Sequence, residues 1–217
     1  MQSFFETEIT KLRKRILKML DIVDMQLAKA DQALFSNDAE VTGPALKNEN
    51  QLDKLDIKID KLCQRIFALT QPVAGDLRFI MSSLRIGNEI ERIGDIALDI
   101  INRSETVRSY PDVLKDYKIH KVLRQAVNLN KKLIEAYANN NPILAKETFE
   151  SCKELGDTCN TIFNDIIGEM TKKSQVITIA TDLILIVRDI ERIGDHMENI
   201  ADSVVFTAEG NRIKHKE

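Results

Sequence analysis

Apolar residues recur every three or four positions over nearly the whole chain, with polar and charged residues between them. The first segment carries the clearest stripe, which consists of Ile9, Leu12, Ile16, Met19, Val23, Leu27, Ala30 and Leu34. This spacing places the side chains on one face of an α-helix, because the helix has about 3.6 residues per turn. The pattern therefore predicts a long amphipathic helix that buries this face.

Short polar or proline-containing segments divide the rest of the chain into five further stripes of the same spacing. These breaks lie at Ser36–Asp38, Gln71-Pro72, Tyr110-Pro111, Asn139–Pro142 and Thr171–Ser174. Proline disfavours helical geometry in the residue before it and is tolerated in a first turn, as at Gly43-Pro44. We expect the third helix to run from about residue 72 or 73 to about Arg103, and the sixth from about Ser174 to about Ala208. The sequence predicts an all-α fold of six long antiparallel helices.

The chain contains an internal repeat. The sequence Glu-Arg-Ile-Gly-Asp at 91–95 recurs 100 residues later at 191–195, and flanking isoleucines match in the same register. The acids of the second helix recur in the fifth with an offset of 101. The repeat predicts two antiparallel three-helix bundles related by a pseudo-two-fold axis. We expect the first at 1–106, the second at 110–209 and a frayed tail at 210–217.

Composition narrows the class of protein. The formal net charge is −3, with 31 basic and 34 acidic residues, which argues against a nucleic-acid binder. There is no apolar run of about 18 residues, so no membrane span is expected, and the N-terminus lacks the pattern of a secretory signal. Cys63, Cys152 and Cys159 include no Cys-x-x-Cys pair, so we interpret them as reduced core residues in a cytoplasmic protein.

The repeated motif places an acidic pair on each of two helices. Glu91 and Asp95 are four residues apart and continue an apolar stripe, as Glu191 and Asp195 do in the second copy. A buried carboxylate is costly unless it gains a counter-charge, a raised pKa, a metal ion or exposure. The glycine between the two acids costs about 0.5–1 kcal/mol in a helix. Its recurrence suggests that another group approaches the backbone closely there.

Further acids follow the second and fifth helices. They are Glu49, Asp53 and Asp56 in the second helix, and Glu150, Glu154 and Asp157 in the fifth. If these helices pack on the third and sixth, rows of carboxylates face each other and repel unless a cation lies between them. Oxygen-only ligands suit hard cations such as magnesium, calcium, manganese or iron. Alternatively, the rows are solvated helix edges or are neutralised by nearby lysines and arginines, and both interpretations stay open.

No motif in the sequence indicates catalysis. A ferritin-like di-iron site would use Glu-x-x-His, yet none of His120, His196 and His215 has a glutamate three residues before it. A Gly-rich phosphate loop and a Gly-x-Ser-x-Gly element are also missing from the sequence. We therefore expect that the protein is not an enzyme, and that His196 is a polar surface or interface residue.

Two motifs together resemble the hallmark of the PhoU family. The first copy reads Gln-Pro-Val-Ala-Gly-Asp-Leu-Arg at 71–78, followed by Ile-Glu-Arg-Ile-Gly-Asp at 90–95. The second copy reads Glu-Arg-Ile-Gly-Asp-His at 191–196 and continues to Asn-Ile-Ala at 199–201. The likeness covers nearly the whole chain, and the two motifs occur in order within a duplicated frame.

The resemblance implies two similar three-helix bundles and a negative regulator of phosphate uptake and of the phosphate-starvation response. It implies an adaptor between a phosphate ABC transporter, through its ATPase subunit, and a membrane sensor histidine kinase. The implied protein is a cytoplasmic homodimer that reaches the inner membrane only through partners. Alternatives are a helical scaffold or chaperone-like protein outside phosphate control, and a carboxylate metalloenzyme.

The resemblance also implies multinuclear metal clusters, with iron or zinc in some members, held by Glu/Asp-x-x-x-Asp motifs. Carried over to matching positions, the ligands are Glu91, Asp95, Glu191, Asp195, Glu49, Asp53, Asp56, Glu150, Glu154 and Asp157. The motif is imperfect in the fifth helix, where Glu154 replaces the final aspartate. Thr161 also stands where the first half has Asp60, so one cluster is expected to have fewer ligands.

Overall fold

The computed structural model describes residues 2–35, 42–172 and 177–213, and these residues form helices without any strand. The elements are α1 (Gln2–Phe35), α2 (Thr42–Leu69), α3 (Ala74–Val107), α4 (Pro111–Asp116), α5 (Ile119–Ala138), α6 (Pro142–Lys172) and α7 (Ile177–Glu209). The predicted all-α class and the six long helices are confirmed. Two of the predicted breaks, at 36–38 and around 173–174, lie outside the described residues.

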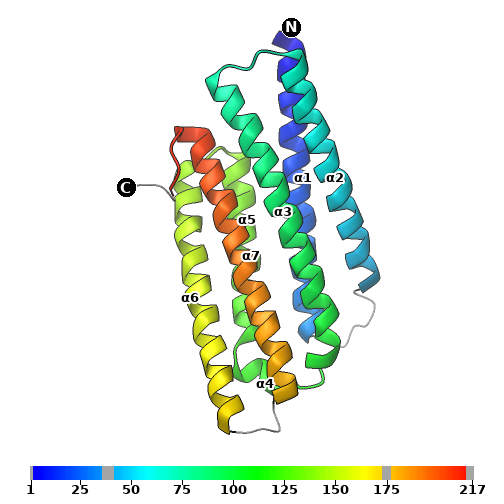
Figure 1. Ribbon diagram of the computed structural model, residues 1–217, viewed down its shortest axis with the longest axis vertical. Helices are drawn as coiled ribbons and strands as arrows, with labels where there is room; N and C mark the ends of the chain where they lie inside the picture. The colour runs from blue at the N-terminus through cyan, green and yellow to red at the C-terminus, as the bar shows by residue number, and fades with distance from the viewer. Residues whose placement is uncertain (1, 36–41, 173–176, 214–217) are drawn as a thin grey trace.

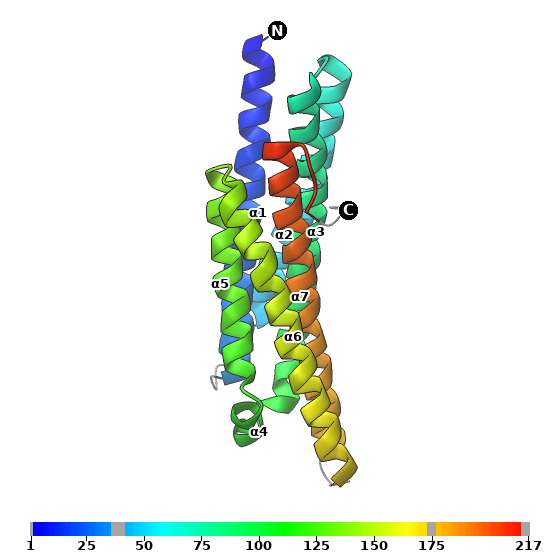
Figure 2. The same ribbon diagram turned by 90° about the vertical axis from the view of Figure 1, so that its left-hand side faces the viewer.

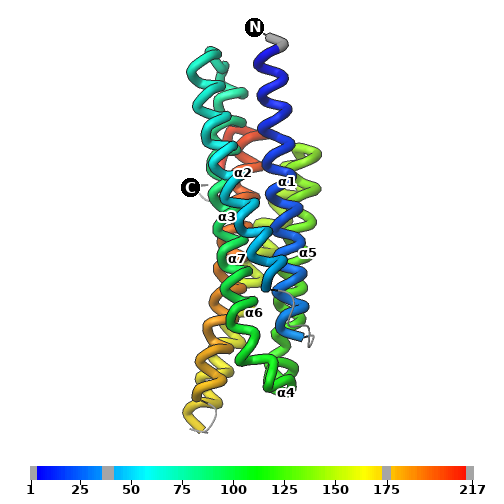
Figure 3. The backbone as a smooth tube through the Cα atoms, turned by 90° about the vertical axis from the view of Figure 1, so that its right-hand side faces the viewer, coloured from blue at the N-terminus to red at the C-terminus, as the bar shows by residue number. Residues whose placement is uncertain are grey.

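The long helices form two layers that run along one axis. In one layer α2, α3, α7 and α6 lie side by side, and α1 and α5 form the other (Figures 1 and 3). The connection between α2 and α3 lies at one end of the molecule and the ends of α6 and α7 reach the opposite end (Figure 1). The two halves therefore run in opposite directions and meet where α3 packs along α7.

One continuous core connects the halves. The predicted stripe of α1 is buried from Leu12 to Leu34, and every long helix contributes fully buried isoleucine or leucine side chains to the same core. All three cysteines are buried thiols that form no disulfide within the described residues, as expected for core residues. In the described part of the chain, no helix is long and apolar enough to span a membrane.

The short helix α4 was not predicted. Pro111 occupies its first turn, where a proline fits, and Leu114 is buried beneath it. Lys118 then adopts a left-handed backbone with φ of 55°, which separates α4 from α5. The sequence indicates only a break at Tyr110-Pro111. The six residues of α4 are too few to show a periodic apolar stripe.

Both ends of helix α3 differ from the prediction. Helix α3 begins at Ala74 and ends at Val107, one turn beyond the expected Arg103, because Ser104 and Val107 are buried. Gly43 and Pro44 do lie in the first turn of α2, as predicted.

Contrary to the prediction of a frayed tail, residues 210–213 pack back onto α7. Gly210 takes a left-handed turn with φ of 78° and reverses the chain after α7. The Arg212 guanidinium then donates to Asp202 Oδ2 at 2.7 Å, and the Ile213 amide donates to Asp202 Oδ1 at 2.7 Å. Because Asp202 is only 1% exposed, these bonds tie the chain end to α7. Residues 214–217 of the predicted tail lie outside the described residues.

Polar side chains cross the interface between the halves. Glu89 on α3 accepts hydrogen bonds from His196 Nδ1 at 2.7 Å and from Asn199 Nδ2 at 3.0 Å, both on α7. At the equivalent place on α7, Asp189 pairs with Arg103 of α3 at 3.5 Å. His196 is therefore an interface residue between the halves, which agrees with its predicted polar role.

Candidate functional site

The two repeated glycines mark the closest approach of neighbouring helices. A Cβ atom at Gly94 would collide with Cδ1 of Leu52 on α2, and a Cβ atom at Gly194 would lie 3.2 Å from Cδ2 of Leu155 on α6. The expectation that another group approaches the backbone here is confirmed, and the group is a buried leucine in each half. These crossings set how α2 lies on α3 and how α6 lies on α7.

The crossing of α2 and α3 brings together the acids predicted in the first half. Glu49 shares a hydrogen bond with Asp95, while its Oε2 atom is buried and has no partner. Asp53 and Glu91 lie close enough to add to the electrostatic repulsion at Glu49. Asp56 lies about two helical turns beyond Glu49 on α2, and its Oδ1 atom lies close to Gly87 of α3.

Burial and mutual repulsion raise the pKa of three of these carboxyls. Burial, the bond to Asp95 and the nearby acids raise the pKa of Glu49 to about 8. Burial and then Asp95 raise the pKa of Glu91, and burial together with Asp60 and Asp53 raises the pKa of Asp56. At neutral pH the Glu49–Asp95 pair therefore holds a shared proton.

One arginine reaches the cluster from the solvent side. The Arg92 Nε atom lies 3.6 Å from Glu91 Oε2, and its Nη1 atom lies 3.5 Å from Asp95 Oδ2. From helix geometry alone, Arg92 is expected to point about 100° away from Glu91. Its long side chain bends back instead, but it stays 57% exposed and screened, so it neutralises the acids only in part.

The second half is built in a different register from the predicted one. Leu52 and Leu155 occupy equivalent places under the repeated glycines, which makes the offset between α2 and α6 103 residues. The predicted offset of 101 is therefore wrong. With the observed offset, Glu49 and Asp56 correspond to Cys152 and Cys159, which are both buried. The spacing of Leu52 and Ile59, repeated in Leu155 and Ile162, carried this register in the sequence.

The acids predicted on the fifth long helix, which is α6 in the structure, accordingly face away from Glu191 and Asp195. Glu150 is 63% exposed and pairs with Lys153 on its own helix at 3.3 Å. Glu154 is exposed as well. Asp157 lines a hollow against the start of α5. The structure therefore does not bring these three residues to the acidic pair of α7.

A fixed positive charge takes the place of those acids. The Arg188 Nη1 atom donates to Glu191 Oε2 and, at 2.9 Å, to Asn160 Oδ1. The Asn160 amide in turn donates to Glu191 Oε1 at 3.1 Å, and the Arg188 guanidinium stacks 3.9 Å from the centre of the Phe163 ring. The first half has Asn88 at the position of Arg188. A guanidinium thus neutralises the second site, whereas a proton and the exposed Arg92 partly neutralise the first.

The two halves also differ in how they fit a metal ion. No three His, Cys, Asp or Glu side chains of the described residues converge closely enough to hold one ion as they stand. The first half nevertheless fits a hard cation in its donors, since all are oxygens, one buried oxygen of Glu49 lacks a partner and the shared proton is displaceable. The second half does not fit, because Arg188 and Asn160 occupy the oxygens of Glu191.

Comparisons with known proteins agree with this duplicated architecture. A family model described as PhoU domain matches residues 16–104 and 119–204. The phosphate-specific transport system accessory protein PhoU of Serratia marcescens is 26% identical over 211 residues, which cover 97% of this chain and 87% of that protein. A PhoU homolog of Rhizobium meliloti is 30% identical over 210 residues, covering 96% of this chain and 88% of that protein.

Solved structures give the same result. The crystal structure of PhoU from Pseudomonas aeruginosa superposes with a TM-score of 0.86 at 26% identity, over 95% of this chain and 100% of that one. The phosphate transport system regulatory protein PhoU from Streptococcus pneumoniae also gives 0.86, at 22% identity, over 96% and 99% of the two chains. The second likeness speaks for the fold alone.

Proposed function

This chain belongs to the PhoU family, and from that membership we propose that it is an accessory protein of a phosphate-specific transport system. In this role it restrains phosphate uptake and the phosphate-starvation response. The observation that carries the proposal is the match of the PhoU domain to both halves of the chain, over 16–104 and 119–204. Relatives named as accessory proteins of a phosphate-specific transport system align with nearly the whole chain, which supports the proposal.

Deletion of the gene tests this proposal. We expect cells without it to express a phosphate-starvation reporter in phosphate-rich medium, and the wild-type gene to restore repression. A scaffold or chaperone acting outside phosphate control predicts no change in the reporter. Repression that persists in the deletion strain would therefore refute the proposal.

We also propose that the protein acts by binding and not by catalysis. Its partners would be the ATPase subunit of the phosphate ABC transporter and a membrane sensor histidine kinase, so that it is a cytoplasmic protein held at the membrane only by these contacts. The resemblance of the motifs at 71–78 and 191–196 to the family hallmark supports this finer role. Co-purification of the tagged chain with the ATPase subunit is the expected result, and its failure in cross-linked cells would contradict the adaptor role.

We propose in addition that two copies of the chain form a dimer. Exposed apolar side chains at the end of α2 and along the start of α3 support a protein interface there, namely Leu69, Val73, Leu77 and Met81. Light scattering after size exclusion should give twice the chain mass, and Met81→Glu should give the monomer mass. Ile143→Glu, at an exposed position on α6, is the matched control and should leave the dimer intact. A monomeric wild-type chain would contradict the proposal.

We propose finally that the acidic cluster of the first half binds a hard cation such as iron, manganese or magnesium. Glu49, Glu91 and Asp95 would hold it, with Asp53 and Asp56 beside them. A bound cation would supply positive charge that holds α2 against α3. The support is the buried, unpartnered oxygen of Glu49 and its raised pKa. A cation there would displace the shared proton, so its binding should release protons at pH 7.

Metal analysis and proton release test the cation site together. We expect stoichiometric metal after anaerobic loading, a proton released on binding and a higher melting temperature. Glu49→Gln with Asp95→Asn should abolish all three effects, whereas Glu150→Gln with Asp157→Asn should change none of them. Metal retained by the first double variant, or none in the loaded wild type, would refute the site.

A further inference from the structure

The second half of the chain has a shorter first helix than the first half. Helix α1 has 34 residues, whereas α5 has only 20. In the first half, α1 extends along α2 and α3 toward their connected ends (Figure 2). In the second half, the chain arrives through the six-residue α4 and turns at Lys118, and α4 faces the end of α6 and the start of α7 across a hollow.

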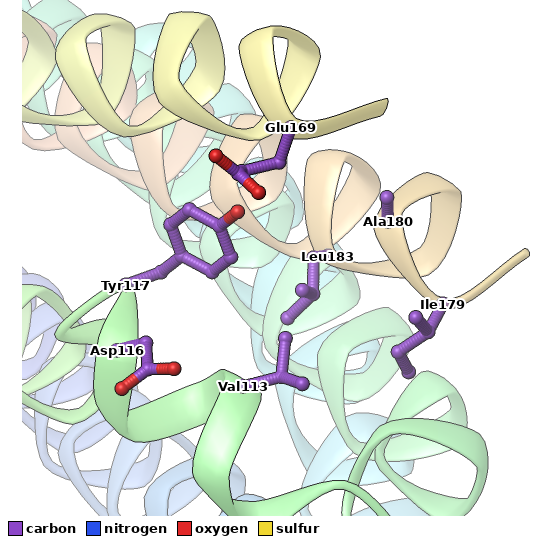
Figure 4. Close-up of a pocket in the computed structure, with 7 residues that line it drawn as sticks. All are labelled: Val113, Asp116, Tyr117, Glu169, Ile179, Ala180 and Leu183. Carbon is purple, nitrogen blue, oxygen red and sulfur yellow. The ribbon is translucent and has the colours of Figure 1, made fainter. Parts of the chain in front are cut away.

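A cavity of about 290 Å3 remains beneath α4. Its lining consists of Val113, Asp116, Tyr117, Glu169, Ile179, Ala180 and Leu183 (Figure 4). Leu183 is fully buried and Ile179 is 8% exposed, so the floor formed by α7 is apolar. The opposite side is polar, because the Tyr117 ring lies between the carboxylates of Glu169 and Asp116 (Figure 4).

The polar side of the cavity has negative potential. Among the described residues that line it, two are acidic and none is basic. Burial raises the pKa of the Tyr117 hydroxyl, and the charges of Glu169, Asp165 and Asp116 raise it further. The carboxylates that disfavour phenolate here would favour a cation at the same place, whereas burial disfavours either charge and Lys172 lowers the pKa of Tyr117.

The nearby lysines do not fill this space. Lys172 pairs with Glu169 Oε1 at 3.0 Å, but its side chain is 69% exposed and lies outside the lining. Lys118 and Lys121 line a neighbouring hollow that shares Asp116 and Tyr117 with this cavity, and they do not line the cavity itself.

We propose that this cavity binds an organic cation with a short apolar stem, of the alkylammonium class. The ammonium group would lie beside Glu169 and the Tyr117 hydroxyl, with Asp116 adding negative charge from the other side of the ring, and the stem would pack on Val113, Ile179 and Leu183. The volume is at the small end of ligand pockets, which span about 300–1,000 Å3, so a single short chain fits better than a multi-ring ligand. A free amine or a lysine side chain of a partner protein would supply this chemistry. The inference does not depend on the role in phosphate transport.

Methyl NMR of the full chain with n-butylammonium tests the site directly. Saturable shifts are expected at the methyl groups of Val113, Ile179 and Leu183. Butanol has the same stem without the charge and ammonium ion has the charge without the stem, so each should bind at least about tenfold more weakly. Equal shifts with butanol, or no saturable shift with n-butylammonium, would overturn the proposal.

Charge-neutral variants supply the matched control. Asp116→Asn with Glu169→Gln should weaken n-butylammonium binding about tenfold, because two partly exposed carboxylates are lost. Asp112→Asn with Glu147→Gln removes the same charge from α4 and α6 outside the cavity and should leave the affinity unchanged. Equal affinity in both double variants, with unchanged melting temperatures, would refute the assigned site.

A peptide arm distinguishes the two sources of the cation. A short lysine peptide that displaces n-butylammonium, while its Nε-acetylated form does not, would support a partner's lysine side chain as the ligand. Binding of n-butylammonium without competition from the peptide would support a free amine. Displacement by both peptide forms alike would contradict recognition of the charge.

Discussion

At the scale of single residues, Glu49 links the acidic cluster to the stability of the fold. Its pKa of about 8 lies far above the ordinary value of 4.5, chiefly through burial and then through Asp95. The folded state therefore binds this proton more tightly than the unfolded chain does. It follows that the favourable contribution is complete below about pH 4.5 and is lost as the pH rises toward 8.

Glu49→Gln should reduce the loss of folding stability that the wild type shows as the pH rises. The amide keeps a donor for Asp95 and carries no charge, so the variant should be more stable than the wild type at pH 8.5 by about 1 kcal/mol, a figure reduced for solvent screening. Urea unfolding at pH 5 and pH 8.5 measures the difference. Asp112→Asn, at an exposed site on α4, is the control, and parallel pH profiles for all three proteins would contradict the role of Glu49.

Gly94 carries a second prediction at this scale. Gly94→Ala would drive a methyl group into the buried Leu52, so we expect a loss of about 1–3 kcal/mol in the free energy of unfolding. A Cβ atom at Gly156 would meet no neighbouring side chain or helix within 4 Å among the described residues, and Gly156→Ala should instead gain about 0.5–1 kcal/mol. Thermal unfolding of the two variants decides the matter, and stabilisation by both would show that the helix crossing does not need a glycine.

The sequence predicted part of this chemistry correctly. The spacing of four put Glu91 and Asp95 on one helix face, and the repeated glycine indicated a close approach. The α6 residues that lie opposite Glu191 and Asp195 could not be predicted from this spacing, because the prediction aligned the acids of α2 with the acids of α6. The actual register follows the buried leucines, which the charges obscured, and it places Cys152 and Cys159 where the first half has Glu49 and Asp56.

At the scale of elements, the contact between α3 and α7 depends on buried polar pairs. Burial opposes the charge on Glu89, but the hydrogen bonds from His196 and Asn199 outweigh it and hold the pKa of Glu89 below its usual value. Its stabilising contribution is therefore present above pH 4.5 and is lost as the pH falls below that value.

Glu89→Gln should destabilise the chain by about 1–2 kcal/mol at pH 7, since a charge-assisted hydrogen bond becomes a neutral one. The deficit should shrink between pH 7 and pH 3, because the wild-type carboxyl takes up protons as the pH falls below 4.5. Urea unfolding at the two pH values measures it, with Glu105→Gln at an exposed position of α3 as the control. A deficit of the same size at both pH values would mean that the charge of Glu89 does not act as described.

The chain end gives a further prediction for α7. Removal of residues 210–217 takes away Arg212 and the Ile213 amide from the buried Asp202, and should cost about 2–3 kcal/mol. Asp202→Asn in the shortened chain should recover part of this loss, because it removes the buried charge. A shortened chain as stable as the full one would show that the turn at Gly210 contributes nothing to the fold.

At the scale of the whole molecule, the fold was predictable because one signal dominates the sequence. The period of three and four extends through α1, α2, α3, α5, α6 and α7, and each stripe is buried in the structure. The common core of the halves was not predictable, because pattern within one helix does not say which helices pack side by side. The six-residue α4 and the cavity beneath it also escaped prediction, because they result from how α4, α6 and α7 of the second half pack against one another.

The rate of phosphate uptake in phosphate-rich medium tests the central claim most directly. A protein that restrains a phosphate transporter should, when deleted, let cells accumulate labelled phosphate faster than the wild type, and the restored gene should return the rate to its original value. Uptake that is the same with and without the gene, in cells where the transporter is present, would contradict the assignment to phosphate control.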